Sequence, residues 1–244
     1  IIIMPIVFFA FLIYRGYWKG ALSIFLVSMS LLFLPGIFIG WEYNLFLLGE
    51  WWNGINPSQR ENVLDFSRAG FGSLVTALFH NQNGKVSLIF ITPLSIKSIV
   101  FITNGLRLFL IFFTLYFLRS LPFQKAKFTL HRLWEVGYLF LVIPFLFPHQ
   151  QNYAYFFVYP AVVYLMYVFF EKIKTRGSFG KLDLKDKYFL GILGLSYLMM
   201  SLELFLGEFR TFYIDIRLMT WAAILLFIVY SFLPSNKRVL EKRD

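Results

Sequence analysis

The chain has no cysteine, only three histidines and few charged side chains, which make up 15% of its 244 residues. The absence of cysteine excludes disulfide bonds, thiolate chemistry and cysteine-ligated metals. The three histidines lack metal-ligand spacing to one another, so we expect no metal and no other cofactor. There is also no H-E-x-x-H or G-x-S-x-G motif, which argues against a metalloprotease or a serine hydrolase. The sequence contains no glycine-rich phosphate loop and no internal repeat.

Apolar residues are abundant instead: 59% of the chain is hydrophobic and 21% is aromatic, including 32 Phe. A soluble domain of this size could not bury that much apolar surface, so we predict an all-α, polytopic membrane protein with membrane lipids around it. The formal net charge of +10 would also suit nucleic acid. The basic residues, however, form short clusters between apolar runs, as membrane-topology signals do, so we expect no nucleic-acid partner.

Transmembrane helices need roughly 20 apolar residues, and the chain contains seven candidate runs. They cover residues 1–14, 21–40, 96–118, 134–147, 153–170, 188–206 and 214–232. The first run begins at Ile1 without a leader, so we interpret the sequence as the C-terminal part of a longer chain and treat residues 1–244 as one membrane domain. The fourth run is short, and we expect it to re-enter the membrane or to be buried within the protein.

Lys and Arg residues cluster after the first, third, fifth and seventh runs, and this alternation predicts the topology. Cytoplasmic connections are rich in basic residues, which places the C-terminus in the cytoplasm and the other connections outside the plasma (inner) membrane. The outward side then carries one long loop, residues 41–95. In this loop we expect an interfacial helix over residues 41–55, because aromatic rings with polar neighbours gather at the headgroup level, and a second short helix over residues 71–79.

Polar residues crowd between the fourth and fifth runs, directly after Pro148. Proline cannot donate a backbone hydrogen bond and disfavours helical backbone in the residue before it, so the incoming helix should break here. The polar residues are His149, Gln150, Gln151, Asn152 and Tyr153. We predict a site on the outer face, with His149 as the catalytic residue and the other four binding substrate; the alternative is a plain helical hairpin with a solvated turn.

Arg107 lies within the third run, roughly 14 Å along the helix from Ser98 and therefore near the middle of a hydrocarbon core about 30 Å thick. A charge at this depth is costly and normally faces protein or water. Asn104 lies one turn earlier on the same helix face. We predict that both bind substrate, because a guanidinium fork suits phosphate or carboxylate. A structural salt bridge from Arg107 to Glu203 is the equal alternative.

Three further arginines are candidate substrate-binding residues. Arg68 lies in the long outward loop between apolar neighbours. Arg210 and Arg217 lie in the last outward turn, where they could bind an anionic substrate. The alternative is a charge network in which these two arginines pair with Glu208 and Asp215.

Three stretches of the sequence, residues 3–18, 66–74 and 148–161, resemble motifs of glycosyltransferase family 87. This family belongs to the GT-C class of multi-span enzymes that use polyprenyl-phosphate sugars. The second stretch departs from the pattern, because Phe71 and Gly72 stand where an Asn-Gln pair is expected. The resemblance implies transfer of a hexose, mannose by the same resemblance, from a polyprenyl-phosphate donor to a lipid-linked or cell-envelope glycan acceptor.

Within this resemblance His149 acts as a general base on the acceptor hydroxyl or as a hydrogen-bond partner of the leaving phosphate. An imidazole, with an unperturbed pKa near 6.5, suits either role. The class also implies an acidic catalytic residue in a first outward loop that would precede Ile1, so we expect residues 1–244 alone to be inactive. The alternative function is a multi-span transporter or lipid flippase, in which Arg107, Glu203 and the broken fourth helix line a path for the substrate.

Overall fold

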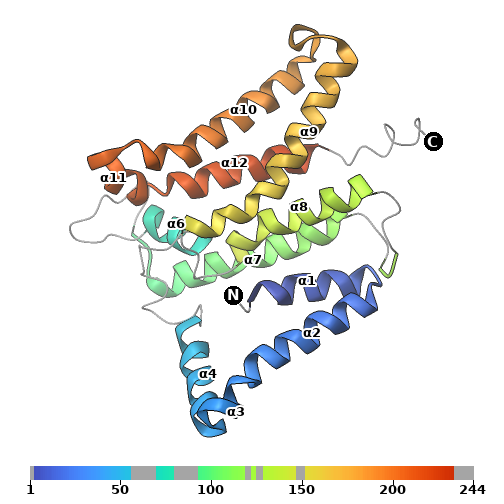
Figure 1. The fold of residues 1–244 in the computed structure, drawn as a ribbon. Helices are drawn as coiled ribbons and strands as arrows, with labels where there is room; N and C mark the ends of the chain where they lie inside the picture. Colours follow the sequence, from blue (N-terminus) through green and yellow to red (C-terminus); the bar gives the residue numbers. More distant parts are fainter. Residues whose placement is uncertain are drawn as a thin grey trace.

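The computed structural model describes residues 3–55, 70–79, 93–118, 122–124, 129–146 and 152–233 (Figure 1). Over these ranges the chain is helical and contains no strand, which confirms the predicted all-α class. The α-helices are α1 (Ile3–Tyr14), α2 (Trp18–Phe33), α3 (Pro35–Ile39), α4 (Trp41–Ile55), α6 (Phe71–Phe79), α7 (Ile96–Leu118), α8 (Thr129–Leu146), α9 (Tyr159–Arg176), α10 (Leu184–Ser201), α11 (Arg210–Asp215) and α12 (Leu218–Phe232). Four short 3₁₀ helices join them: η1 (Asn152–Val158), η2 (Phe179–Lys181), η3 (Leu202–Leu204) and η4 (Gly207–Phe209).

Each predicted apolar run coincides with a helix, but fewer than seven of these helices are suited to crossing a membrane. Three described stretches are long and apolar enough, namely Trp18–Ile39, Ile96–Leu118 and Ala154–Arg176. A fourth is obtained if the bent pair Gly207–Asp215 and Leu218–Phe232, with 62° between its halves, counts as one span.

The physical reasons for the shorter count are length and charge. Helix α1 has 12 described residues and so extends only about 18 Å, against about 30 Å of hydrocarbon. Helices α8 and α10 have 18 residues each, but their N-terminal turns carry charges, including Arg132 in α8 and Asp186 in α10. A count of apolar runs does not subtract these charged turns from the helix length that can cross the hydrocarbon, so it gives too many membrane spans.

The long helices run back and forth, so that their ends alternate between two sides of the molecule (Figure 1). The C-terminal ends of α1, α7, α9 and α12 lie on one side, which is the side that the basic clusters predict to be cytoplasmic. Helices α6 and α11 and the N-terminal end of α7 lie on the other side. The order of helix directions thus agrees with the predicted alternation, while the orientation in a membrane stays a prediction.

Helix α8 is at the centre of the core. Ten of its 18 residues are buried, and it packs against α9, α1, α7 and α12. The described part of the fourth run is therefore buried in the protein, which is one of the two alternatives that the sequence left open. Gly137 permits the closest approach in this core, because a Cβ added there would lie 2.5 Å from the Tyr230 hydroxyl of α12 and 3.3 Å from the Ala161 Cα of α9. The Tyr230 hydroxyl donates to the Trp134 carbonyl at 2.7 Å.

Local signals located several helix ends correctly. The described part of helix α8 reaches Leu146, and the break predicted at Pro148 lies outside the described residues. Helices α4 and α6 have the bounds that the sequence indicated, 41–55 and 71–79. In Figure 1 α4 runs across the direction of α2, the arrangement that an interfacial helix would have beside a spanning one.

An ion pair that the sequence analysis did not foresee lies at the opposite end of α8. Arg15 and Glu135 are both buried and form a salt bridge, with Arg15 Nε donating to Glu135 Oε2 at 3.1 Å. Arg15 Nη1 also donates to the Gln124 carbonyl at 2.9 Å, and His131 Nε2 lies 3.0 Å from Glu135 Oε1. Arg15 is therefore not only a topology signal, since it ties α1 to α8 and to residues 122–124.

Candidate functional site

Arg107 of α7 faces the first turn of α6. Its Nη1 donates to Asn104 Oδ1 at 3.1 Å, which confirms that the two residues share a helix face. A Cβ added at Gly72 of α6 would lie 3.8 Å from Arg107 Nη2 and 3.7 Å from Thr103 Cγ2. Arg107 Nε is buried and has no hydrogen-bond acceptor in the described part of the chain. Asn104 thus occupies one edge of the guanidinium and leaves donors available for an anion.

Glu203 pairs with Arg210 and not with Arg107. Arg210 Nε and Nη2 both donate to Glu203 Oε1, at 3.1 and 3.0 Å. Over the described ranges Arg107 makes no ion pair, so the expected alternative of a structural Arg107–Glu203 salt bridge is wrong. The predicted partners of Arg210 are wrong as well, because the carboxylate that it binds is neither Glu208 nor Asp215.

Thr220 of α12 joins three segments that are far apart in the sequence. Its Oγ1 accepts a hydrogen bond from the Tyr155 hydroxyl of η1 at 3.0 Å and lies 3.4 Å from the backbone nitrogen of Gly70, just before α6. Phe71, at the start of α6, stacks on Phe145 of α8 with ring centroids 4.7 Å apart. These contacts hold α6 against the segment that follows the predicted His149 turn.

Arg217 is buried at the sharp turn between α11 and α12. Its backbone is left-handed, with φ of 58°, and it precedes the first residue of α12. Its Nη1 donates to the Ile214 carbonyl at 3.0 Å, and its own carbonyl accepts from the backbone nitrogen of Thr220 at 2.9 Å. Arg217 therefore lies beside the Thr220 junction, whereas Arg210 is exposed and already bonded to Glu203.

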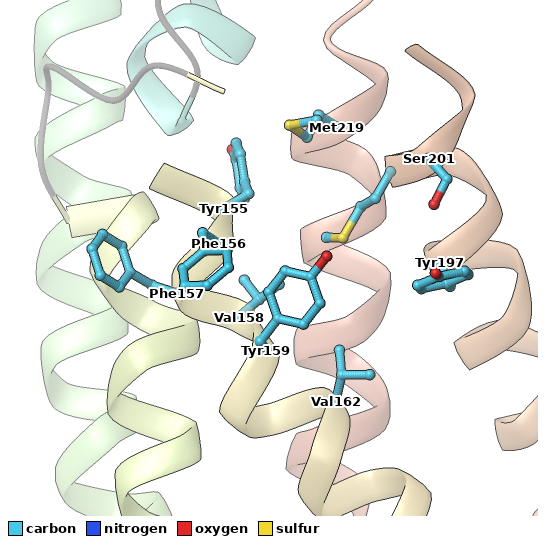
Figure 2. Close-up of a pocket in the computed structure, with 10 residues that line it drawn as sticks. Tyr155, Phe156, Phe157, Val158, Tyr159, Val162, Tyr197, Ser201 and Met219 are labelled. Carbon is cyan, nitrogen blue, oxygen red and sulfur yellow. The ribbon is translucent and has the colours of Figure 1, made fainter. Parts of the chain in front are cut away.

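An apolar cleft of about 570 Å³ lies between η1, α9, α10 and α12 (Figure 2). Its lining residues are mainly aromatic side chains and methionines: Tyr155, Phe156, Phe157, Val158, Tyr159, Val162, Tyr197, Met200, Ser201 and Met219. The sequence analysis missed this cleft. Its only sequence signal is the dense run of aromatic residues from 153 to 159, which by itself is equally typical of a helix that packs in a core.

Comparisons with protein-family models, with curated proteins and with solved structures found no match for this chain. The resemblance to glycosyltransferase family 87 stays a prediction from the three short motifs.

The remaining predicted site residues lie where no contact can be assigned. Arg68, His149, Gln150 and Gln151 lie outside the described residues. Asn152 and Tyr153 form the start of η1, but their side chains are also outside the described set. Because Tyr155 of η1 bonds to Thr220, the backbone that follows the predicted His149 turn is nevertheless held on the α6 side of the molecule.

Proposed function

We propose that this chain is the lipid-carrier-binding part of a membrane glycosyltransferase, which moves a hexose, mannose by the family resemblance, from a polyprenyl-phosphate donor to a lipid-linked or cell-envelope glycan acceptor. The observation that supports this proposal is the position of Arg107. It lies within an apolar helix of spanning length, faces a neighbouring helix and has no carboxylate partner among the described residues.

A guanidinium in an apolar helix requires compensation, because an arginine at a bilayer centre costs at least about 2.5 to 3.5 kcal/mol. Asn104 supplies one neutral acceptor, which does not balance the charge. A lipid-borne phosphate would supply the missing anion, and the planar fork of an arginine can bind it through two parallel hydrogen bonds. Gly72 brings the backbone of α6 close to the guanidinium, because even a Cβ added there would lie only 3.8 Å from Arg107 Nη2.

His149 completes the proposed mechanism as a prediction from the sequence. It would accept the proton of the acceptor hydroxyl, or donate a hydrogen bond to the leaving phosphate, on the same side as α6. Gln150, Gln151, Asn152 and Tyr153 would bind the sugar through their hydrogen-bonding groups.

Donor binding by variants of the full-length protein tests the role of Arg107. Arg107→Lys keeps the charge but loses the fork, and Arg107→Ala loses both, so affinity for a polyprenyl-phosphate sugar should fall in that order. Hydrogen bonds to charged groups contribute about 1.5 to 3 kcal/mol, so the alanine variant should bind roughly tenfold to a hundredfold more weakly. Lys97→Ala is the matched control, because Lys97 is an exposed cation in the first turn of the same helix. Unchanged donor binding by a folded Arg107→Ala protein would contradict the proposal.

A transporter or lipid flippase is the second candidate, and one observation favours it. Transporters build their sites from pairs of interrupted helices near the membrane midplane. The structure bends by 62° between α11 and α12, where Arg217 lies. Purified protein in lipid vesicles distinguishes the two functions: sugar transfer to an acceptor indicates the enzyme, and movement of an intact labelled carrier lipid without sugar transfer indicates the flippase.

A further inference from the structure

We propose that the cleft between α9, α10 and α12 binds an acyl chain of a bilayer phospholipid. This inference goes beyond the proposed glycosyl transfer and does not depend on it, since the cleft is lined by none of the predicted substrate-binding residues with described side chains. It requires only that the chain resides in a membrane.

The cleft exists because α9 and α10 are joined at one end and pack on different partners elsewhere. Ion pairs Lys172–Asp186 and Arg176–Asp183 close the turn between the two helices. The Arg176 guanidinium lowers the pKa of the Asp183 carboxyl, which therefore stays ionised near neutral pH. Away from this turn α9 packs along α8, and α10 packs along α12. The space between the two pairs is the cleft, with Met219 of α12 at its back (Figure 2).

The chemistry of the lining suits hydrocarbon. Among the described residues, no charged side chain lines the cleft. The Tyr155 hydroxyl is engaged with Thr220, so this tyrosine contributes mainly its ring to the wall. Water needs two to four polar partners to occupy a cavity, and the inner wall of valine and methionine offers none. The flexible side chains of Met200 and Met219 can adapt to a chain of variable conformation.

The surroundings of the cleft also indicate hydrocarbon. Its α9 wall belongs to the stretch Ala154–Arg176, which is long and apolar enough to cross a membrane. The rim residues Phe156, Tyr159 and Tyr197 are 70%, 50% and 58% exposed, so the cleft opens sideways from the helix bundle. In a bilayer this opening faces lipid tails, and acyl chains of phospholipids are the species available there in the greatest amount.

The polar end of the cleft favours a zwitterionic headgroup. Ser201, which lines the cleft, is the last residue of α10, and the Glu203–Arg210 ion pair follows it directly in the chain. This pair carries one charge of each sign, which complements a phosphate together with an ammonium group. A polyprenyl phosphate carries only the anionic group and therefore complements only one of the two charges.

Native mass spectrometry of the detergent-purified full-length protein tests the inference. We expect the wild type to retain one phospholipid. Val162→Trp, which fills the cleft, should lower the retained fraction by about tenfold, the equivalent of about 1.4 kcal/mol of binding free energy. Val163→Trp is the matched control, because Val163 is the neighbouring residue on α9, is 57% exposed and does not line the cleft. Arg107→Ala should retain the phospholipid, so a failure of the proposed donor site leaves this result unchanged.

Three results would overturn the inference: a wild-type protein without bound phospholipid, equal retention in Val162→Trp and Val163→Trp, or stoichiometric displacement of the phospholipid by polyprenyl phosphate. If Val162→Trp does not fold, the wild type can be extracted from membranes that contain a phospholipid with a diazirine in its acyl chain, washed with detergent and then irradiated. Cross-links should then form at Met200 and Met219 and not at Leu195, which is exposed on α10 outside the cleft. Absence of cross-links at all three residues after the wash would also refute the site.

Discussion

Gly137→Ala should destabilise the helix core even though alanine is the better helix former. The substituted Cβ would lie 2.5 Å from the Tyr230 hydroxyl and 3.3 Å from Ala161 Cα, so the side chains of two neighbouring helices would have to move. Gly137 and Ala161 are both buried, which leaves little free space for this movement.

The magnitude follows from two opposing effects. Exchanging glycine for alanine within a helix gains about 1 kcal/mol from propensity, whereas overpacking a close-packed core costs about 1 to 3 kcal/mol. We expect Gly137→Ala to lower the free energy of unfolding by up to about 2 kcal/mol. Tyr230→Phe removes the oxygen that clashes and also its hydrogen bond to the Trp134 carbonyl, at a cost of about 0.5 to 1.5 kcal/mol by itself.

The double variant makes the prediction specific. Once the hydroxyl is absent, the nearest atoms to the new Cβ are Ala161 Cα and Tyr230 Cζ, each at 3.3 Å, so Gly137→Ala should cost little in the Tyr230→Phe background. The two substitutions should therefore be non-additive by about 1 to 2 kcal/mol. The assay is reversible unfolding in mixed micelles with increasing sodium dodecyl sulfate, followed by tryptophan fluorescence.

Gly105→Ala is the control for helix propensity. No atom lies within 4 Å of a Cβ built at Gly105, which is exposed on α7, so this variant should be neutral or slightly more stable. Equal effects of Gly137→Ala and Gly105→Ala would refute the proposed close approach of α8, α9 and α12. If the effects of Gly137→Ala and Tyr230→Phe on the free energy of unfolding simply add in the double variant, the Tyr230 hydroxyl is not the group that the new Cβ meets.

The remaining predictions concern one buried ion pair, the catalytic residue and the topology. Glu135→Ala should lower the free energy of unfolding by about 3 to 5 kcal/mol, because it leaves Arg15 buried without its carboxylate partner. The apolar double variant Arg15→Met/Glu135→Leu should recover most of this loss in the same unfolding assay. A loss below about 1 kcal/mol for Glu135→Ala would contradict the pairing. His149→Gln in the full-length enzyme should lower turnover by about 10²- to 10⁴-fold with little change in donor binding, and near-normal turnover would exclude a general base at this position. A single cysteine replacing Asn83 should react with an impermeant thiol reagent added outside intact cells. A single cysteine replacing Ser178 should react only after the cells are permeabilised. Labelling of the Ser178 variant in intact cells would contradict the predicted topology.

Local sequence signals predicted the helices better than the number of membrane crossings. The bounds of α7, α4 and α6 follow from the sequence because an apolar run, an aromatic cluster and a short amphipathic segment each act within a few neighbouring turns. Whether α8 or α10 is apolar enough to cross a membrane depends on the charges in their first turns, and a count of apolar runs weights those charges too little.

The sequence by itself determined the helical class, the apolar character of the chain and the shared face of Asn104 and Arg107, because all three depend on composition or on helical spacing. Only the tertiary structure decided which charges meet. Glu203 was expected to compete for Arg107, and it pairs with Arg210 instead. Arg15 forms its ion pair with Glu135, which lies 120 residues further along the chain. The cleft beside α9 also depends on the tertiary structure, because it lies between the pair α8–α9 and the pair α10–α12. Ion-pair partners and cavities arise from the packing of helices that are distant in sequence, and no local pattern of residues encodes that packing.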